Sequence, residues 1–111
     1  MTMSLSIRRI GTASVVSLIG EIDLQNSHEV RKELLACLVE HRDVVVDLAK
    51  VGYIDSSGVA SLIEAYQVAR RTGLRFSLAA VSAAAMRVLK LARLDEVFVI
   101  HADTDDATKG P

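Results

Sequence analysis

The chain has 111 residues, of which 50% are hydrophobic and 24% charged, with 13 Lys and Arg against 14 Asp and Glu. This length and balance are typical of one globular domain with a single core, and they argue against a disordered tail or a fibrous repeat. A net charge of −1 provides no field that would draw the protein to nucleic acid or to an anionic membrane, so we expect neither partner.

No segment has the pattern of a membrane span or a secretion signal. The stretches without charged residues are well short of the roughly 20 residues that a bilayer-spanning helix requires, and the polar start of the chain is unlike a signal peptide. We therefore expect a single domain over residues 1–111, without membrane insertion and located in the cytoplasm.

Redox and metal chemistry have few candidate residues. Cys37 is the single cysteine, and the leucines around it favour a small buried core residue over a reactive thiol. His28, His41 and His101 lie far apart, with no second ligand at a metal-binding spacing. The sequence predicts no metal site and no cofactor.

The first two predicted elements form a β-hairpin. Ser4–Ile10 and Ser14–Asp23 are runs rich in Ile and Val, separated by the turn residues 11–13. Asn26 then stands three residues before Glu29, the spacing of a capping box, and is predicted to begin a helix. The apolar face of this helix repeats at helical period and consists of Val30, Leu34, Cys37 and Leu38.

The middle of the chain predicts a buried strand followed by a long helix. Asp43–Leu48 is a nearly continuous β-branched run, which favours a central strand covered on both faces. After the loop Asp55–Gly58, a helix is predicted to end at Gly73, because glycine suits a left-handed cap and Arg70 and Arg71 suit the C-terminal end of the helix dipole. The apolar face of this helix consists of Val59, Leu62, Ile63 and Tyr66.

The last third of the chain predicts a strand, a helix and a final strand. Leu74–Val81 alternates as a strand, Ser82 can cap a helix from Ala83 to about Ala92, and Glu96–Ile100 is the last strand. Residues 101–111 are expected to form a frayed polar tail, so that the core spans about residues 5–100. The order β-β-α-β-α-β-α-β predicts an α/β fold, a mixed sheet packed with about three to four helices on one or both sides.

The loop Asp55-Ser56-Ser57-Gly58 is the main candidate site. It joins the carboxyl end of a strand to the start of a helix, where free N–H groups and the helix dipole favour anions. A purely structural explanation is that Ser56, Ser57 or Asp55 caps the helix and that Gly58 eases a tight turn.

Three kinds of catalytic site fit this loop poorly. A serine hydrolase would need flanking glycines and a histidine within reach, and a P-loop would need a longer glycine-rich stretch followed by lysine. A zinc or two-carboxylate enzyme would need converging ligands, for which Asp23, Asp47 and Asp55 are the candidates. We therefore expect a protein that is not an enzyme.

Most of the chain, from about Leu5 to Ile100, resembles the STAS domain of bacterial anti-sigma-factor antagonists. The resemblance rests on "GEID" at residues 20–23, on "VVVDL" at residues 44–48, and on "YIDSSG" at residues 53–58, which runs into a helix followed by "RRTGLRFSLAAVS". The four-residue match D-S-S-G would be weak alone. Its register with the strand before it and the helix after it makes the resemblance specific.

The resemblance implies a binding protein that is itself a substrate. Family members bind an anti-sigma factor that is also a serine protein kinase, and a metal-dependent PP2C-type phosphatase reverses the phosphorylation. Family members do not hydrolyse ATP themselves, and the ATP is bound by the partner kinase. By alignment Ser56 is the phosphorylation site, Asp23 and Asp55 flank it, and Ser57 and Gly58 shape the loop, with Ser57 helping to cap the helix.

The partner is expected to dock over the Asp55–Gly58 loop and the exposed side of the following helix. There Ser61, Glu64 and Gln67 lie off the apolar stripe and are candidates for contact. A phosphoryl group adds about −1.5 to −2 charge, which a helix N-terminus tolerates, so phosphorylation should weaken binding rather than the fold.

Two departures from the antagonist pattern leave other functions open. Many antagonists continue D-S-[ST]-G-L-G, whereas this chain has Gly58-Val59-Ala60, and the C-terminal helix is expected to be absent or very short. Alternatives with the same fold are the cytoplasmic STAS subunit of a lipid-transport ABC system, which holds an ATPase subunit, and a signalling scaffold that assembles with copies of itself.

Overall fold

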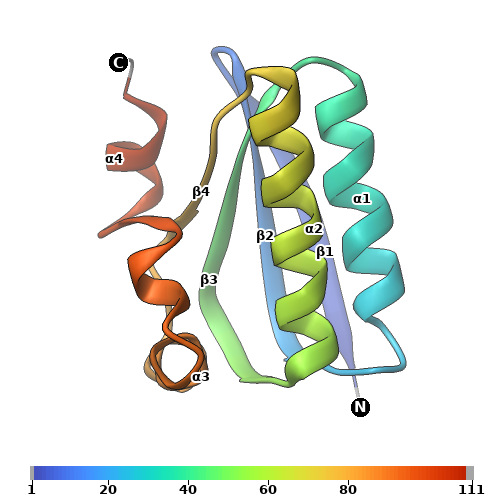
Figure 1. Ribbon diagram of the computed structural model, residues 1–111, viewed down its shortest axis with the longest axis vertical. Helices are drawn as coiled ribbons and strands as arrows, with labels where there is room; N and C mark the ends of the chain where they lie inside the picture. The colour runs from blue at the N-terminus through green and yellow to red at the C-terminus, as the bar shows by residue number, and fades with distance from the viewer. Residues whose placement is uncertain (1, 110–111) are drawn as a thin grey trace.

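Five strands form one sheet in the order β1-β2-β3-β4-β5 in the computed structural model, which describes residues 2–109 (Figure 1). β1 (Met3–Ile10) and β2 (Ala13–Ile22) are an antiparallel hairpin. The strands β3 (Asp43–Ile54), β4 (Phe76–Ala79) and β5 (Val99–His101) continue the sheet in parallel with β2. The hairpin, the central position of β3 and the mixed sheet are confirmed.

Three helices connect the parallel strands: α1 (Ser27–Val39), α2 (Ser56–Thr72) and α3 (Ala83–Leu91). Each connection moves to the next strand in the same direction, so right-handed crossovers place all three helices on one face of the sheet. Figure 1 shows α1 and α2 side by side in front of the sheet. Among residues 2–109, no helix combines the length and the hydrophobicity that crossing a bilayer would require.

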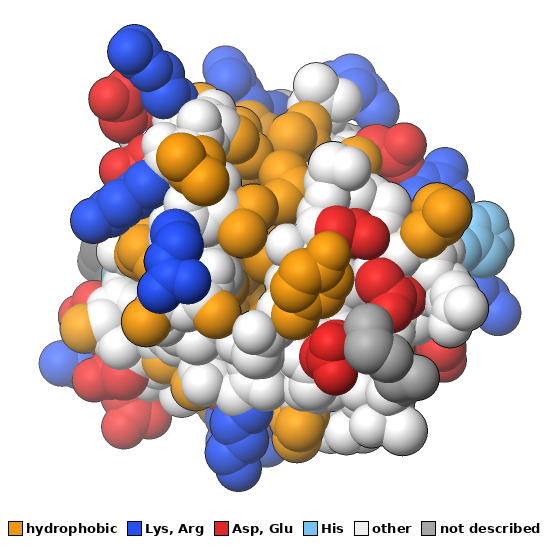
Figure 2. All heavy atoms as spheres, turned by 90° about the horizontal axis from the view of Figure 1, so that it is seen from below, with side chains coloured by type: hydrophobic (Ala, Val, Ile, Leu, Met, Phe, Trp, Pro, Cys, Tyr) orange, Lys and Arg blue, Asp and Glu red, His pale blue; other side chains and the backbone are white. Residues whose placement is uncertain are grey.

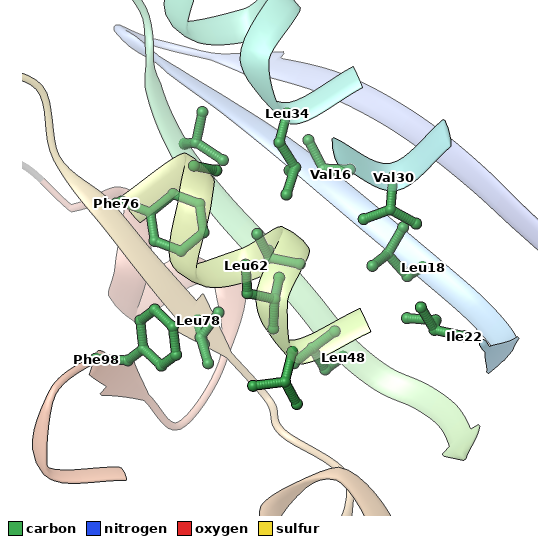
Figure 3. Packing of buried hydrophobic residues seen from close by; sticks show 14 of the residues in the cluster. Val16, Leu18, Ile22, Val30, Leu34, Leu48, Leu62, Phe76, Leu78 and Phe98 are labelled. Atoms are coloured by element: carbon green, nitrogen blue, oxygen red, sulfur yellow. The ribbon is translucent and has the colours of Figure 1, made fainter. Parts of the chain in front are cut away.

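The main core lies between this face of the sheet and the helices (Figure 3). Leu34 of α1 and Leu62 of α2 point toward Val16 and Leu18 of β2 and Leu48 of β3, and all five are fully buried. The four predicted apolar residues of α1, Cys37 among them, are buried, as are Val59 and Leu62 of α2. An aromatic cluster closes the core beside β4 and consists of Tyr66, Phe76 and Phe98, with ring centroids 5.4–6.3 Å apart.

The opposite face of the sheet carries a smaller apolar cluster, and the end of the chain packs on it. The helix α4 (Thr104–Thr108) packs Ala107 against the buried cluster of this face, which consists of Ala13, Val15, Val45 and Ala79. Asp103 caps this helix by accepting a hydrogen bond from the Asp106 backbone N–H at 2.7 Å. The expectation of a frayed tail was therefore wrong for residues 104–108. A single turn with one half-buried alanine leaves no hydrophobic periodicity to detect.

The last strand also differs from its predicted bounds. Leu94–Glu96 form a 3-10 turn, η1, and β5 begins only at Val99. The intervening Phe98 is 4% exposed because it turns into the core against Tyr66 rather than joining the strand. Burial of one aromatic ring thus outweighs the strand preference of its neighbours.

Candidate functional site

The Asp55–Gly58 loop lies at the carboxyl end of the sheet, where β3 ends and α2 begins. In Figure 1 this is the lower end of the molecule. The Asp55 backbone N–H donates to the carbonyl of Ile22, the last residue of β2, at 3.1 Å. This bond holds the loop after β3 against the turn after β2, so Asp23 and Asp55 belong to the same end of the protein.

Asp55 is the residue that caps α2. Its Oδ1 accepts hydrogen bonds from the backbone N–H groups of Ser57 at 2.9 Å and Gly58 at 3.2 Å, and from the Ser57 hydroxyl at 2.5 Å. The Ser57 hydroxyl, then the Gly58 and Ser57 N–H groups, hold the pKa of Asp55 below its ordinary value, because they favour the ionised carboxylate. Ser57 is thus a donor to the cap, and the prediction that its side chain caps the helix was wrong.

The two adjacent serines have different environments. Ser56 is exposed at the first position of α2, whereas Ser57 is half-buried and its hydroxyl is engaged by Asp55. Ser56 is therefore the serine that offers a hydroxyl to another molecule.

Gly58 is needed for space rather than for a turn. Its φ is not positive, and a Cβ added there would lie 2.7 Å from both Ile22 Cγ2 and Ile54 Cγ1. Ile22 and Ile54 are buried at the ends of β2 and β3. The absence of a side chain at Gly58 thus lets the first turn of α2 sit directly on the two strand ends.

Asn26 shapes the turn that carries Asp23, and the predicted capping box is absent. The Asn26 side chain makes no capping bond to α1. Instead its Oδ1 accepts from the Asp23 N–H at 3.0 Å, and its Nδ2 donates to the Glu21 carbonyl at 2.8 Å. The side chain is engaged by backbone groups three and five residues before it, whereas the capping-box spacing considers only the residues that follow it.

Hydrophobic and acidic side chains share this end of the molecule. Glu21, Asp23 and Asp55 are half-buried and take part in none of the ion pairs found within residues 2–109. Tyr53 and Leu24 are exposed beside them, at 46% and 78%. Figure 2 looks onto this end and shows acidic side chains gathered on one side of a hydrophobic area. Sequence reasoning missed both apolar residues, although Tyr53 alternates with the buried Ile54 and so had to face outward.

Of the three predicted contact residues on α2, two are exposed and one is buried. Glu64 and Gln67 are exposed, and Glu64 pairs with Arg31 of α1. Ser61 is only 5% exposed, and its hydroxyl donates to the Ser27 carbonyl at 2.9 Å and to the Ser57 carbonyl at 3.1 Å. Ser61 packs between the helices, and its predicted place on the docking surface was wrong.

The three candidate acids do not form one cluster. Asp47 lies midway along β3, where it accepts hydrogen bonds from the Ser17 hydroxyl and the Ala49 N–H, while Asp23 and Asp55 lie at the end of the sheet. Within residues 2–109 no three His, Cys, Asp or Glu side chains converge as a metal site would need.

Known proteins resemble this chain over nearly its whole length. The family model for the STAS domain matches residues 4–107. The anti-sigma-B factor antagonist of Bacillus subtilis (strain 168) is 21% identical over 105 residues, which cover 95% of this chain and 96% of that protein. The crystal structure of an anti-sigma factor antagonist from Mycobacterium paratuberculosis is 26% identical with a TM-score of 0.84, covering 96% of this chain and 91% of that one.

A third relative is the Bacillus cell fate determinant SpoIIAA in its phosphorylated form. It has a TM-score of 0.75 and covers 94% of this chain and 96% of its own, and at 17% identity it supports the fold alone.

Proposed function

Because this chain belongs to the STAS domain family, we propose that it is an anti-sigma-factor antagonist controlled by phosphorylation of Ser56. In this proposal the protein catalyses no reaction itself. It binds an anti-sigma factor that is also a serine protein kinase, the kinase inactivates it by modifying Ser56, and a PP2C-type phosphatase restores it. Full-length similarity to proteins named as antagonists supports this role.

The contrast between Ser56 and Ser57 carries the assignment of the modified residue. A kinase must reach the acceptor hydroxyl, and Ser56 is exposed at the start of α2. Modifying Ser57 would remove the hydroxyl proton that bonds Asp55 and would place two anions at hydrogen-bonding distance. Ser56 can accept a phosphoryl group without either cost.

The capping geometry supports an effect of phosphate on binding rather than on the fold. The Ser57 and Gly58 N–H groups, which would otherwise attract a phosphate, are already bonded to the Asp55 carboxylate. A phosphate on Ser56 therefore stands in solvent beside Asp55 and adds about −1.5 to −2 charge to an end that already holds Glu21 and Asp23. A partner packed there must then desolvate that charge, which weakens the complex.

The proposed docking surface is the Asp55–Gly58 loop together with Glu64 and Gln67 on α2. Glu64→Lys should weaken kinase binding and leave the melting temperature within about 2 °C, because an exposed ion pair contributes little to stability. Arg31→Gln is the matched control, since it breaks the same ion pair without changing the α2 surface. Equal loss of binding in both variants would assign the effect to the ion pair and count against this surface.

A pull-down from native cytoplasm with the unmodified protein tests the role. Capture of a histidine-kinase-like ATPase supports the antagonist, whereas capture of an ABC ATPase with its permease would replace it with the transporter subunit. The captured kinase is then incubated with ATP and each variant, and the phosphate is located by peptide mass spectrometry.

The serine variants separate the two hydroxyls. Ser56→Ala should resist phosphorylation and stay bound to the kinase, and Ser57→Ala should still accept phosphate. Ser56→Asp and Ser56→Glu should bind the kinase more weakly than the unmodified protein. Phosphate on Ser57 alone would refute the residue assignment.

A further inference from the structure

An open cleft of about 960 Å³ lies at the end of the protein opposite to Ser56. Its floor is formed by the first residues of β3 and β4 and by Val99 of β5, and its walls by the C-terminal end of α2 and by α4. In Figure 1 it belongs to the upper end, where α2 ends and α4 lies. Along α2 the lining residues Tyr66 and Arg70 lie about 15 and 21 Å from Ser56. The cleft is therefore distinct from the Asp55–Gly58 loop, while Gln67 of the proposed docking surface lies within one helical turn of Arg70.

Three cations line this cleft from both sides. Arg70 and Arg75 lie on the α2 side and Lys109 on the α4 side. The ion pairs found within residues 2–109 involve other cations, so these three have no carboxylate partner in that part of the chain. Arg70 suits the C-terminal dipole of α2, and Lys109 is the C-terminal cap residue of the short helix α4. Arg75 lies outside both helices, so helix stability does not account for it.

The acidic groups of the cleft are already engaged. Asp43 accepts a hydrogen bond from the Arg75 backbone N–H at 2.9 Å, and Asp106 lies 3.0 Å from His101 Nδ1. The bond to Asp43 uses the backbone N–H of Arg75 and leaves its guanidinium available to another group. The lining holds the three cations against the carboxylates of Asp43 and Asp106, which leaves an excess of one positive charge when His101 is neutral.

The floor of the cleft offers apolar contact and a free strand edge. Val99 is 56% exposed, and the ring of Tyr66 lies below the Arg70 guanidinium, 5.8 Å from it. β5 is the last strand of the sheet, so its outer backbone groups are unpaired by any described strand. An inorganic anion would contact the three cations but would make no apolar contact with Val99 and no strand pairing with β5.

We propose that this cleft binds an extended acidic segment of a partner protein, with an apolar side chain among its carboxylates. The carboxylates meet Arg70, Arg75 and Lys109, and the apolar side chain covers Val99. Since the site lies away from Ser56, the segment can bind whether or not Ser56 is modified, and the cleft gives the protein a second contact point.

Fluorescence anisotropy with the purified protein tests this. The probe is a short fluorescein-labelled peptide of Asp and Glu with one Leu and one Phe, and the reference peptide has Asn and Gln in place of the acids. The acidic peptide should bind, weaken as salt is raised, and lose about tenfold in affinity in the Arg70→Glu/Arg75→Glu variant. The control, Arg87→Glu/Lys90→Glu, makes the same charge change at exposed positions of α3 and should retain binding.

Several results would overturn the proposal. These are no binding of the acidic peptide, equal binding of the amide peptide, or equal losses in the two double variants when both keep the wild-type circular dichroism and melting temperature. Displacement of the peptide by inorganic phosphate would show a simple anion site, and tighter binding of an RNA oligonucleotide would show a nucleic-acid site. Self-association that requires Arg70 and Arg75 would make a second copy the occupant. None of these outcomes affects phosphorylation of Ser56, which is measured separately.

Discussion

Replacing Gly58 with alanine should destabilise the protein even though alanine is the better helix former. The added Cβ would lie 2.7 Å from Ile22 Cγ2 and from Ile54 Cγ1, and 3.2 Å from Ile54 Cδ1. Ile22 and Ile54 are buried between the strand ends and α2, so neither side chain can swing into solvent. Relieving the contact requires the first turn of α2 to lift or both isoleucines to shift.

The size of the effect follows from two opposing terms. Overpacking of a close-packed core costs about 1–3 kcal/mol, and the gain in helix propensity from Gly to Ala returns at most about 1 kcal/mol. The free energy of unfolding should therefore fall by about 1–2 kcal/mol, which for a domain of this size lowers the melting temperature by about 5–10 °C.

Gly52→Ala is the matched control for this prediction. Gly52 lies in the same β3 strand, is exposed, and has no atom within 4 Å of an added Cβ. Its alanine variant should stay within about 0.5 kcal/mol of the wild type. Urea unfolding followed by circular dichroism measures both variants. If Gly58→Ala proves as stable as Gly52→Ala, close packing on the strand ends is not the reason for glycine.

Three further predictions concern Asp55, Asn26 and Cys37. The lowered pKa of Asp55 gives stability that is present above the ordinary value of 3.8 and is lost as pH falls through the lowered folded value. As the pH falls from above 3.8 through the lowered folded value, the wild type should therefore lose stability relative to Asp55→Asn, and parallel pH curves would contradict this. Asn26→Ala should cost about 1–3 kcal/mol by leaving the Asp23 N–H and Glu21 carbonyl without their partner, and Asn26→Ser, suited to a capping box, should not restore it in urea unfolding. Burial raises the pKa of the Cys37 thiol, so iodoacetamide should modify the native protein on the order of a hundredfold more slowly than the denatured one; similar rates would refute its place in the core.

Much of the fold was predictable because its signals are local. The hairpin, the buried β3 and the apolar faces of α1 and α2 follow from hydrophobic period, and Gly73 ends α2 with φ 75° as a left-handed cap. Ser82 caps α3, with its Oγ accepting from the Ala85 N–H at 3.1 Å. Each of these features is decided by residues within a few positions of one another.

The candidate site was predictable in position but not in its internal bonds. The D-S-S-G motif between a strand and a helix located Ser56. The choice of Asp55 as the cap, rather than either serine, depended on which side chain accepts both free N–H groups once the chain leaves β3. Three neighbouring residues were equally able to cap by type, so spacing alone did not separate them.

The burial of Ser61 illustrates what a single helix cannot reveal. Ser61, Ala65 and Ala69 form a line of small buried residues on α2, and the Ser61 hydroxyl reaches the Ser27 carbonyl at the start of α1. A small polar residue next to an apolar stripe looks exposed until a second helix packs on it. The contact surface on α2 is correspondingly narrower than predicted.

By itself, the sequence determined the hairpin, the buried strand β3, the apolar faces of α1 and α2, and the place where a serine loop meets a helix N-terminus, because these depend on period and near neighbours. Only the tertiary structure decided that Ser61 packs against α1, that Gly58 makes room for two isoleucines, and that Arg70, Arg75 and Lys109 share one cleft. These features depend on atoms brought together from distant segments, and such contacts exist only after the sheet and helices have packed.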